Sequence, residues 1–426
     1  MACPKNVSFK DCELSILRNA VDLAEQTQGH ELLSTPEIKK IIKIVEDFIS
    51  HKKLIIYGGT AINNILPKYD QFYDYGYEIP DYDFFSKNAL DDSKELADIY
   101  VKKGFSNIEA KAGIHFGTFK VFVNNIGIAD ITQLHPDIFN VISEDTINKK
   151  RMLYAPANFL RQSMYLELSR PNGDVSRWEK ILKRLILLNK HYPLIHKKCD
   201  IQRKTELPLD EKKIFTIIKK CFVDEGLVFI GGFANALYSK YSKEHNLKFL
   251  PDFDVLSNDP EKTCEQVKKK LKAEGFEVRI TKYDSVGELI NEHYSIQIHD
   301  EYIAFIYNPS ACHSYNEIFD GKDKLKVGTI DTLLSFYLAF MYADKEYYDM
   351  NRLICLSTML FNIQQHNRLK QKGLLKRFSV DCYGVQHTLS DIRNEKSKMK
   401  ETLKKGTRNY DEWFLNYVPK TRKNKK

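Results

Sequence analysis

An internal repeat limits the folds that this chain of 426 residues can adopt. The Gly-Gly pair at 58–59 recurs at 231–232, and the Pro-Asp-aromatic-Asp segment at 80–83 recurs at 251–254. Three further matches keep the same order, and all five offsets lie between 171 and 175 residues. So small a drift over about 100 positions predicts two copies of one α/β unit followed by helices.

The first copy begins with a short apolar segment at 54–57, which predicts a buried strand. Gly58 and Gly59 follow it, and glycines let a turn approach a ligand without a Cβ clash. A helix is expected from Ala61, and its N-terminal amides and dipole suit a phosphate group. Thr60 adds a hydroxyl to this predicted phosphate turn.

Three acids then follow at positions that suit metal ions. Asp81 and Asp83 are two residues apart, so on a strand both side chains point to one face. Asp130 lies on a later predicted strand. Mg²⁺ binds carboxylates and substrate phosphates together, and three carboxylates can hold two ions about 4 Å apart. A Gly-Gly turn or an Asp-x-Asp pair alone is common in ordinary turns, so the ordered set carries the prediction of an active site.

The second copy differs from the first at two of the positions that are candidates for catalysis. Phe233 stands in the place of Thr60, and Phe305 stands in the place of Asp130. An apolar ring can neither ligate a metal nor accept a proton, although Asp252 and Asp254 are retained. We therefore expect a degenerate copy that serves as a scaffold or an RNA-binding surface.

Composition indicates a globular protein, since 43% of residues are apolar and 29% are charged. The N-terminus has no apolar stretch of the secretory type, and the most apolar helical run is too short to span a bilayer. Eight cysteines are scattered without a Cys-x-x-Cys pair, so we expect neither a zinc site nor a disulfide framework, as in a reducing compartment.

Positive charge is concentrated in the C-terminal region. Residues 366–426 contain 17 Lys/Arg and 6 Asp/Glu, whereas the whole chain has a net charge of only +8. A basic region beside a weakly acidic body predicts contact with a polyanion, and we favour RNA because aromatic residues are interspersed. These aromatic residues are Tyr383, Tyr410, Trp413, Phe414 and Tyr417. For the last eight residues, a solvated tail is an equally good interpretation.

Together these patterns predict an α/β (α+β) protein of two tandem units, each a small mixed sheet with helices. Residues 1–50 are expected to form an N-terminal helical segment, and 51–200 the catalytic domain with its following helices. Residues 201–365 are expected to form the degenerate domain, and 366–426 the basic C-terminal region.

The motifs Gly58-Gly59-Thr60, Asp81-x-Asp83 and Asp130 resemble those of the nucleotidyltransferase superfamily. The duplicated layout and the segment Ile-Pro-Asp-Tyr-Asp-Phe-Phe-Ser at 79–86 resemble the poly(A) polymerase catalytic subunits of poxviruses and other large cytoplasmic DNA viruses. By domain order the resemblance covers residues 30–390. One departure is the 20-residue gap between Thr60 and Asp81, which holds a tyrosine-rich stretch.

The resemblance implies template-independent transfer of AMP from ATP to the 3′ end of viral mRNA. It implies two Mg²⁺ or Mn²⁺ ions, one held by Asp81, Asp83 and Asp130 and the other by the first two acids. Gly58, Gly59 and Thr60 would contact the triphosphate.

Further phosphate contacts are expected from the helical segment after Asp130, first from Lys180 and then from Arg177. Arg161, Lys183 and Arg184 are further candidates, and for each residue a solvated basic face is the alternative. The implied partners are single-stranded RNA and ATP, without a membrane, together with either a homodimer partner or a viral processivity subunit. The implied location is the host cytoplasm or viral factory, or the virion.

Two alternatives remain open. One is a nucleotidyltransferase with another acceptor, such as a tRNA, an oligoadenylate, an antibiotic or a protein. The other is an inactive RNA-binding scaffold.

Overall fold

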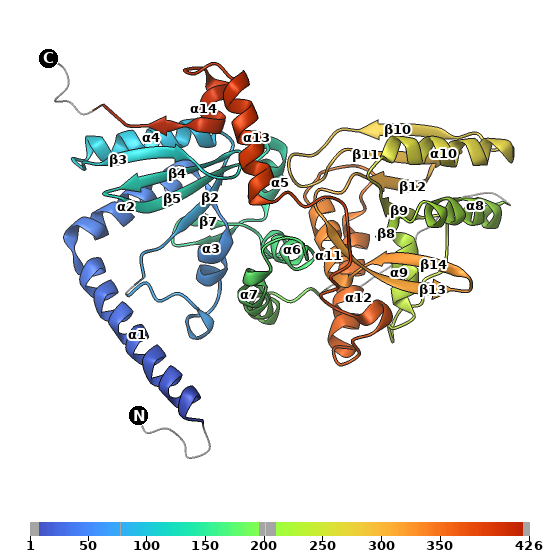
Figure 1. Cartoon of the computed structure of the whole chain (residues 1–426), viewed down its shortest axis with the longest axis horizontal. Helices are drawn as coiled ribbons and strands as arrows, with labels where there is room; N and C mark the ends of the chain where they lie inside the picture. Colours follow the sequence, from blue (N-terminus) through green and yellow to red (C-terminus); the bar gives the residue numbers. More distant parts are fainter. Residues whose placement is uncertain (1–7, 77, 196–200, 202–209, 421–426) are drawn as a thin grey trace. The chain divides into compact units, whose positions relative to one another are not determined.

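The chain folds into two compact units, each built on its own eight-stranded sheet (Figure 1). The structure is a computed structural model, and it describes residues 8–76, 78–195, 201 and 210–420. Unit 1 comprises Met1–Leu134, Thr146–Ala155 and Glu395–Lys426, and unit 2 comprises His135–Asp145 and Pro156–Asn394.

The sheet of unit 1 has the strand order β16-β3-β4-β5-β2-β1-β7-β6. The central strands β2 and β5 are parallel, and Asp83 of β2 lies opposite Asp130 of β5. The strands are β1 (Ile55–Ile56), β2 (Tyr82–Ser86), β3 (Ile108–Ala112), β4 (Thr118–Val123), β5 (Ile126–Gln133), β6 (Ile147–Lys149), β7 (Met152–Tyr154) and β16 (Asn416–Tyr417).

Helix α2 packs in unit 1 through an apolar stripe. Helix α2 begins where Thr35 accepts from the amide of Ile38 and Pro36 occupies the first turn, and it buries residues such as Ile41 and Val45. The helices of unit 1 are α1 (Phe9–Ser34), α2 (Pro36–Lys52), α3 (Gly58–Ile65), η1 (Lys68–Asp70), α4 (Ala89–Lys102), α14 (Arg408–Phe414) and the end of α13 (Leu389–Thr402).

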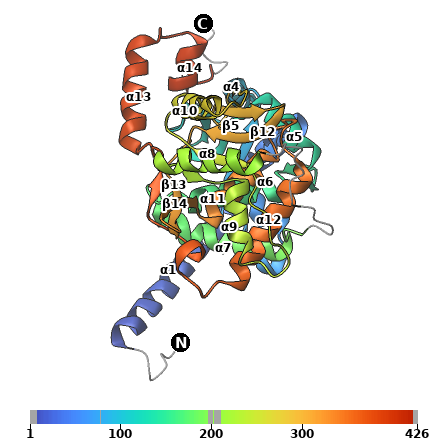
Figure 2. The same ribbon diagram turned by 90° about the vertical axis from the view of Figure 1, so that its right-hand side faces the viewer.

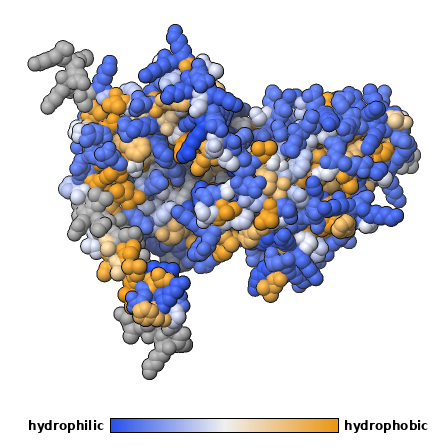
Figure 3. Space-filling view, in the orientation of Figure 1, coloured by the Kyte–Doolittle hydropathy of each residue, from blue (hydrophilic) through white to orange (hydrophobic). Residues whose placement is uncertain are grey.

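Helix α1 extends away from the sheet of unit 1 (Figures 1 and 2). Several large apolar side chains along it are exposed, among them Phe9, Leu17 and Leu23, and Figure 3 shows apolar surface on this helix. Among the residues that the structure describes, no helix, α1 included, combines the length and apolar character needed to span a bilayer.

The sheet of unit 2 repeats this arrangement in the order β10-β11-β12-β9-β8-β14-β13-β15. Strands β9 and β12 are parallel, as β2 and β5 are, and Asp254 lies opposite Phe305. The predicted fold class and duplication are therefore confirmed. The strands are β8 (Val228–Phe229), β9 (Phe253–Leu256), β10 (Arg279–Tyr283), β11 (His293–Ile298), β12 (Glu301–Tyr307), β13 (His313–Asp320), β14 (Asp323–Gly328) and β15 (Cys382–Tyr383).

The helices of unit 2 include α6, although α6 falls within residues 51–200, the predicted catalytic domain. Helix α6 packs on α11, so the residues after Ala155 group with the second copy and not with the first. The helices are α5 (Pro136–Glu144), α6 (Ala157–Leu168), η2 (Val175–Arg177), α7 (Trp178–His191), α8 (Glu211–Asp224), α9 (Gly232–Ser239), α10 (Pro260–Ala273), α11 (Ile330–Phe340), α12 (Met350–His366), η3 (Gly373–Leu375) and the start of α13.

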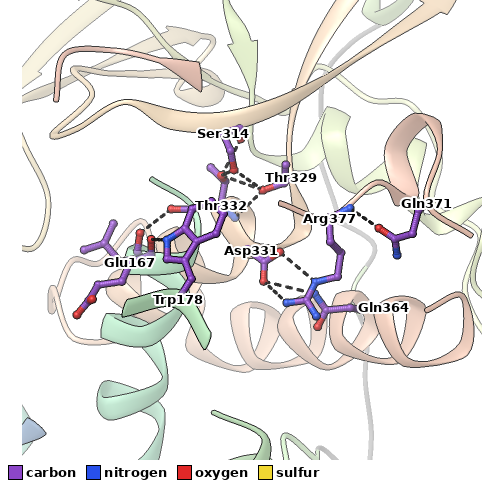
Figure 4. Close-up of polar contacts among 11 residues, drawn as sticks. Glu167, Trp178, Ser314, Thr329, Asp331, Thr332, Gln364, Gln371 and Arg377 are labelled. Atoms are coloured by element: carbon purple, nitrogen blue, oxygen red, sulfur yellow. Dashed lines mark hydrogen bonds and ion pairs between the residues drawn. The ribbon is translucent and has the colours of Figure 1, made fainter. Parts of the chain in front are cut away.

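The basic C-terminal region is not a separate domain. Its first part belongs to unit 2, where Arg377 donates to the buried carboxylate of Asp331 at the start of α11 at 2.6 Å (Figure 4). Its last part returns to unit 1, where β16 pairs with the edge strand β3. This grouping differs from the predicted boundary at 366, because contacts distant in sequence decide where these residues pack.

The expectation that the cysteines form no disulfide framework was wrong. Cys312 and Cys382 are joined, with their Cα atoms 5.2 Å apart. They are 70 residues apart in sequence and meet because β15 pairs with β13. Cys221 and Cys264 are buried free thiols.

Candidate active site

The glycine turn of unit 1 touches the acidic strand. Helix α3 begins at Gly58, whose φ of +69° lies in the region that glycine adopts most readily. A Cβ at this position would lie only 2.7 Å from Oδ2 of Asp83. The amide of Tyr57 donates to the carbonyl of Asp83 at 2.9 Å. The turn and the carboxylate of Asp83 therefore lie against each other, and a Cβ at Gly58 would force this carboxylate to shift.

The three predicted acids occupy neighbouring positions in this unit. Asp83 and Asp130 lie opposite each other on β2 and β5, and Asp81 directly precedes β2. Partial burial raises the pKa of Asp81, and the negative charge of Asp130 raises that pKa further. The register of the two strands, and not this effect, gives the arrangement of the three acids.

Tyr57 lies beside the same acids and was not singled out from the sequence. Its ring stacks on Phe85 with centroids 3.9 Å apart, and its hydroxyl lies 2.9 Å from Oγ1 of Thr132. Burial and then the charge of Asp83 raise the pKa of the Tyr57 phenol, with smaller contributions from Asp130 and Asp81. The phenol is therefore a neutral hydrogen-bonding group under the acidic cluster.

A second missed residue, Lys120, places a positive charge in this cluster. It lies on β4 with its Cα opposite that of Asp130, and its ammonium forms an ion pair with Oδ2 of that acid. The alternation along β4 could have revealed it, because Phe119 and Val121 are buried and leave Lys120 on the other face.

The donor chemistry of this site suits a hard divalent cation. Carboxylate oxygens are what Mg²⁺ prefers, and three of them come from one strand pair. Within the described part of the chain, no group of three His, Cys, Asp or Glu side chains is gathered as a formed metal site. The site therefore matches a metal centre in the types of its residues and in their positions relative to the strands.

The predicted phosphate contacts lie in different surroundings. Gly59 is in the first turn of α3, and the buried hydroxyl of Thr60 donates to the carbonyl of Asp81 at 2.6 Å. Arg177 and Lys180 belong to unit 2, where Arg177 lies 3.6 Å from a carboxylate oxygen of Glu167 and Lys180 is exposed on α7.

Arg161 does not contribute to an open phosphate site. It is fully buried, and its guanidinium donates to Asn189, Asn158 and the carbonyl of Tyr192. A helical arginine pattern alone could not distinguish this core residue from a ligand contact.

The second copy places a positive side chain against its retained acid. Arg352 of α12 donates to Oδ2 of Asp252 at 2.6 Å, and both side chains are largely buried. Phe233, in the place of Thr60, is buried in a cluster of phenylalanine rings that includes Phe229 and Phe253. In the second copy, the positions that correspond to Asp81 and Thr60 are therefore occupied by an ion-paired acid and a packed aromatic ring.

In fold, the chain is similar to the Megavirus polyadenylate synthase. The two structures superpose with a TM-score of 0.79 at 20% identity, over 94% of this chain and 85% of that one. In sequence, residues 43–174 match the family model of the poly(A) polymerase catalytic subunit, and this segment contains all three aspartates. The resemblance drawn from the motifs is thereby confirmed.

Curated relatives match part of the chain. A putative poly(A) polymerase catalytic subunit of African swine fever virus (strain Badajoz 1971 Vero-adapted) is 37% identical over 165 residues. The corresponding putative subunit of Acanthamoeba polyphaga mimivirus is 29% identical over 189 residues. These alignments cover 37% and 43% of this chain but only 34% and 31% of the relatives, so the chain matches about a third of their length.

Proposed function

We propose that the protein is a poly(A) polymerase that adds AMP from ATP to the 3′ end of RNA without a template. The observation that carries this proposal is the position of Asp83 and Asp130 on two parallel strands beside a glycine turn, with Asp81 directly before the first of these strands. The family model covers these residues, and the named relatives are viral, which supports viral mRNA as the acceptor.

The chain's own residues suit an in-line nucleotidyl transfer. Bound Mg²⁺, held by the three aspartates, would lower the pKa of the RNA 3′ hydroxyl and neutralise charge on the leaving pyrophosphate. The amides at the start of α3 lie at the positive end of the helix dipole and would orient the triphosphate. Asp130 would accept the proton of the 3′ hydroxyl. Positioning and charge supply the catalysis, so no covalent intermediate with the protein is expected.

RNA contacts would come from the exposed charges of the C-terminal region more than from its aromatic rings. Trp413 packs against Phe116 with centroids 4.6 Å apart, and Tyr417 donates to Asp98 at 2.8 Å. These two aromatic residues therefore attach the returning chain to unit 1. Helix α13, in contrast, buries none of its side chains and carries lysines such as Lys398 and Lys400 on its exposed surface.

The deciding experiment is primer extension with each nucleoside triphosphate separately, on single-stranded RNA and with Mg²⁺ or Mn²⁺. We expect extension with ATP only, in the presence of either ion. Extension of a tRNA or a small acceptor in place of single-stranded RNA would favour another nucleotidyltransferase. No incorporation under any of these conditions would contradict the proposal.

A further inference from the structure

A row of charged residues crosses four strands of unit 1. Lys111 of β3 lies opposite Lys120 of β4, Lys120 opposite Asp130 of β5, and Asp130 opposite Asp83 of β2. The ammonium of Lys120 is ion-paired with Asp130, whose side chain is 23% exposed. Lys111, one strand further away, pairs instead with Glu109 of its own strand at 2.6 Å. Lys120 is thus the lysine of this row that is directed at the acids.

The corresponding positions in unit 2 can be compared with this row of unit 1. Ser295 of β11 lies opposite Phe305 of β12, and Phe305 lies opposite Asp254 of β9. The second copy therefore keeps the acid of the row but has neither the lysine nor its partner acid. If Lys120 served only to stabilise the sheet, nothing would connect its absence from the second copy to the absence of an acid in the place of Asp130.

The physical need for Lys120 follows from the charges around it. Carboxylates from neighbouring strands repel one another, and a carboxylate on a strand edge can turn to solvent. An ammonium fixed on one oxygen of Asp130 holds that carboxylate on the face that it shares with Asp83. The same ammonium also places a positive charge close to any cation that the carboxylates bind, so it weakens cation binding while it sets the geometry.

We propose that Lys120 is a positioning residue for the nucleotidyl transfer and acts through Asp130. This inference rests on the proposed function. Its signature is a pair of opposite effects: removal of Lys120 slows the reaction, because Asp130 is no longer held, and tightens the binding of divalent cations, because a competing charge is gone. A residue that supported only the fold would not produce this combination.

The test compares Lys120→Met, Lys120→Arg and the matched control Lys111→Met in the full-length protein. Steady-state primer extension with ATP gives kcat and KM, and electron paramagnetic resonance titration with Mn²⁺ alone gives metal affinity. For Lys120→Met we expect kcat to fall about 30-fold with little change in the KM for ATP, and Mn²⁺ to bind about fivefold more tightly. Lys120→Arg should recover most of kcat, and Lys111→Met should match the wild type in both measurements.

Other results would overturn the proposal. Wild-type kcat in Lys120→Met would show that Asp130 needs no partner, and weaker Mn²⁺ binding would show that the lysine only supports the local fold. An equal reduction of kcat in Lys111→Met would attribute the effect to the sheet surface. If the wild type itself adds no AMP, the proposed function fails first, and the Mn²⁺ titration alone then decides whether Lys120 faces a cation site.

Discussion

Arg352 donates to Asp252 in the second copy, where the first copy has a carboxylate of the candidate active site. The two copies thus retain the same acid in two different electrostatic settings. In unit 1 the acids lie beside an exposed lysine, whereas in unit 2 a largely buried guanidinium neutralises one of them. This difference explains why an Asp-x-Asp pair alone does not identify the active copy.

The Arg352–Asp252 pair is expected to be structural. Arg352→Met should lower the free energy of unfolding by about 3 kcal/mol, because it removes the positive charge that faces a largely buried carboxylate. Urea denaturation measures this change. The double variant Asp252→Asn/Arg352→Met should recover much of the stability, and additive effects of the two substitutions would show that the two side chains do not interact.

Asp83 and Asp254 occupy matching positions and should differ in function. Asp83→Ala is expected to reduce AMP incorporation by about 1000-fold or more, while RNA binding stays nearly intact. Asp254→Ala should leave incorporation largely unchanged. Single-turnover extension and filter binding measure the two properties, and the reverse pattern would assign catalysis to the second copy.

A comparison of alanine substitutions at Gly58 and Gly104 distinguishes backbone strain from crowding of the candidate active site. Both have positive φ, but a Cβ at Gly58 would meet Asp83, whereas nothing lies within 4 Å of a Cβ at Gly104. Alanine at either position should destabilise the fold by about 1–2 kcal/mol. Only Gly58→Ala should also lose most of its primer extension. Equal activity in the two variants at a temperature where both are folded would contradict the proposed crowding at Asp83.

Two buried histidines should make the protein less stable in acid. Burial lowers the pKa of His293 to about 4 and that of His313 to about 3, below the ordinary value of 6.5. The unfolded chain therefore takes up protons below pH 6.5 that the folded chain refuses, and stability falls as pH decreases from 6.5 toward 4. For His293 this amounts to about 3 kcal/mol at the acid end. His293→Gln should flatten the decline, and a slope identical to that of the wild type would refute the assignment.

The C-terminal tail is expected to contribute charge and no specific recognition. Deletion of residues 420–426 removes five Lys/Arg and should weaken binding to single-stranded RNA. The plot of log affinity against log salt should flatten by about 0.7 for each RNA phosphate that the shortened protein no longer neutralises. A tail of the same length made of Ser and Asn serves as the control, and an unchanged slope in that variant would exclude the tail from the RNA-binding surface.

The sequence was most informative where a short motif limits the backbone geometry of a few residues. The Gly-Gly turn, the Asp-x-Asp spacing and the constant offset between copies predicted both sheets and the relation between Asp83 and Asp130, because strand geometry fixes which side chains share a face. Lys120 was missed because a lysine on a strand of alternating burial is expected to be an ordinary solvent-exposed residue. Its role can be inferred only when its partner on the neighbouring strand is known.

Features that depend on residues distant in sequence could not be predicted. The disulfide between Cys312 and Cys382, the ion pair of Arg352 and the burial of Arg161 all depend on which elements pack together. Nothing in the spacing of these residues distinguishes them from exposed ones.

The return of β16 to the edge of β3 has a consequence for how the protein is made. Unit 1 contains residues from early and late in the chain, so the ribosome must translate beyond residue 417 before this sheet can acquire its last strand. The second copy, encoded in the middle, can complete its own sheet earlier. A nascent chain would therefore finish the second copy before the half that carries the three acids, and a stop codon before residue 395 would release a protein with an uncovered sheet edge.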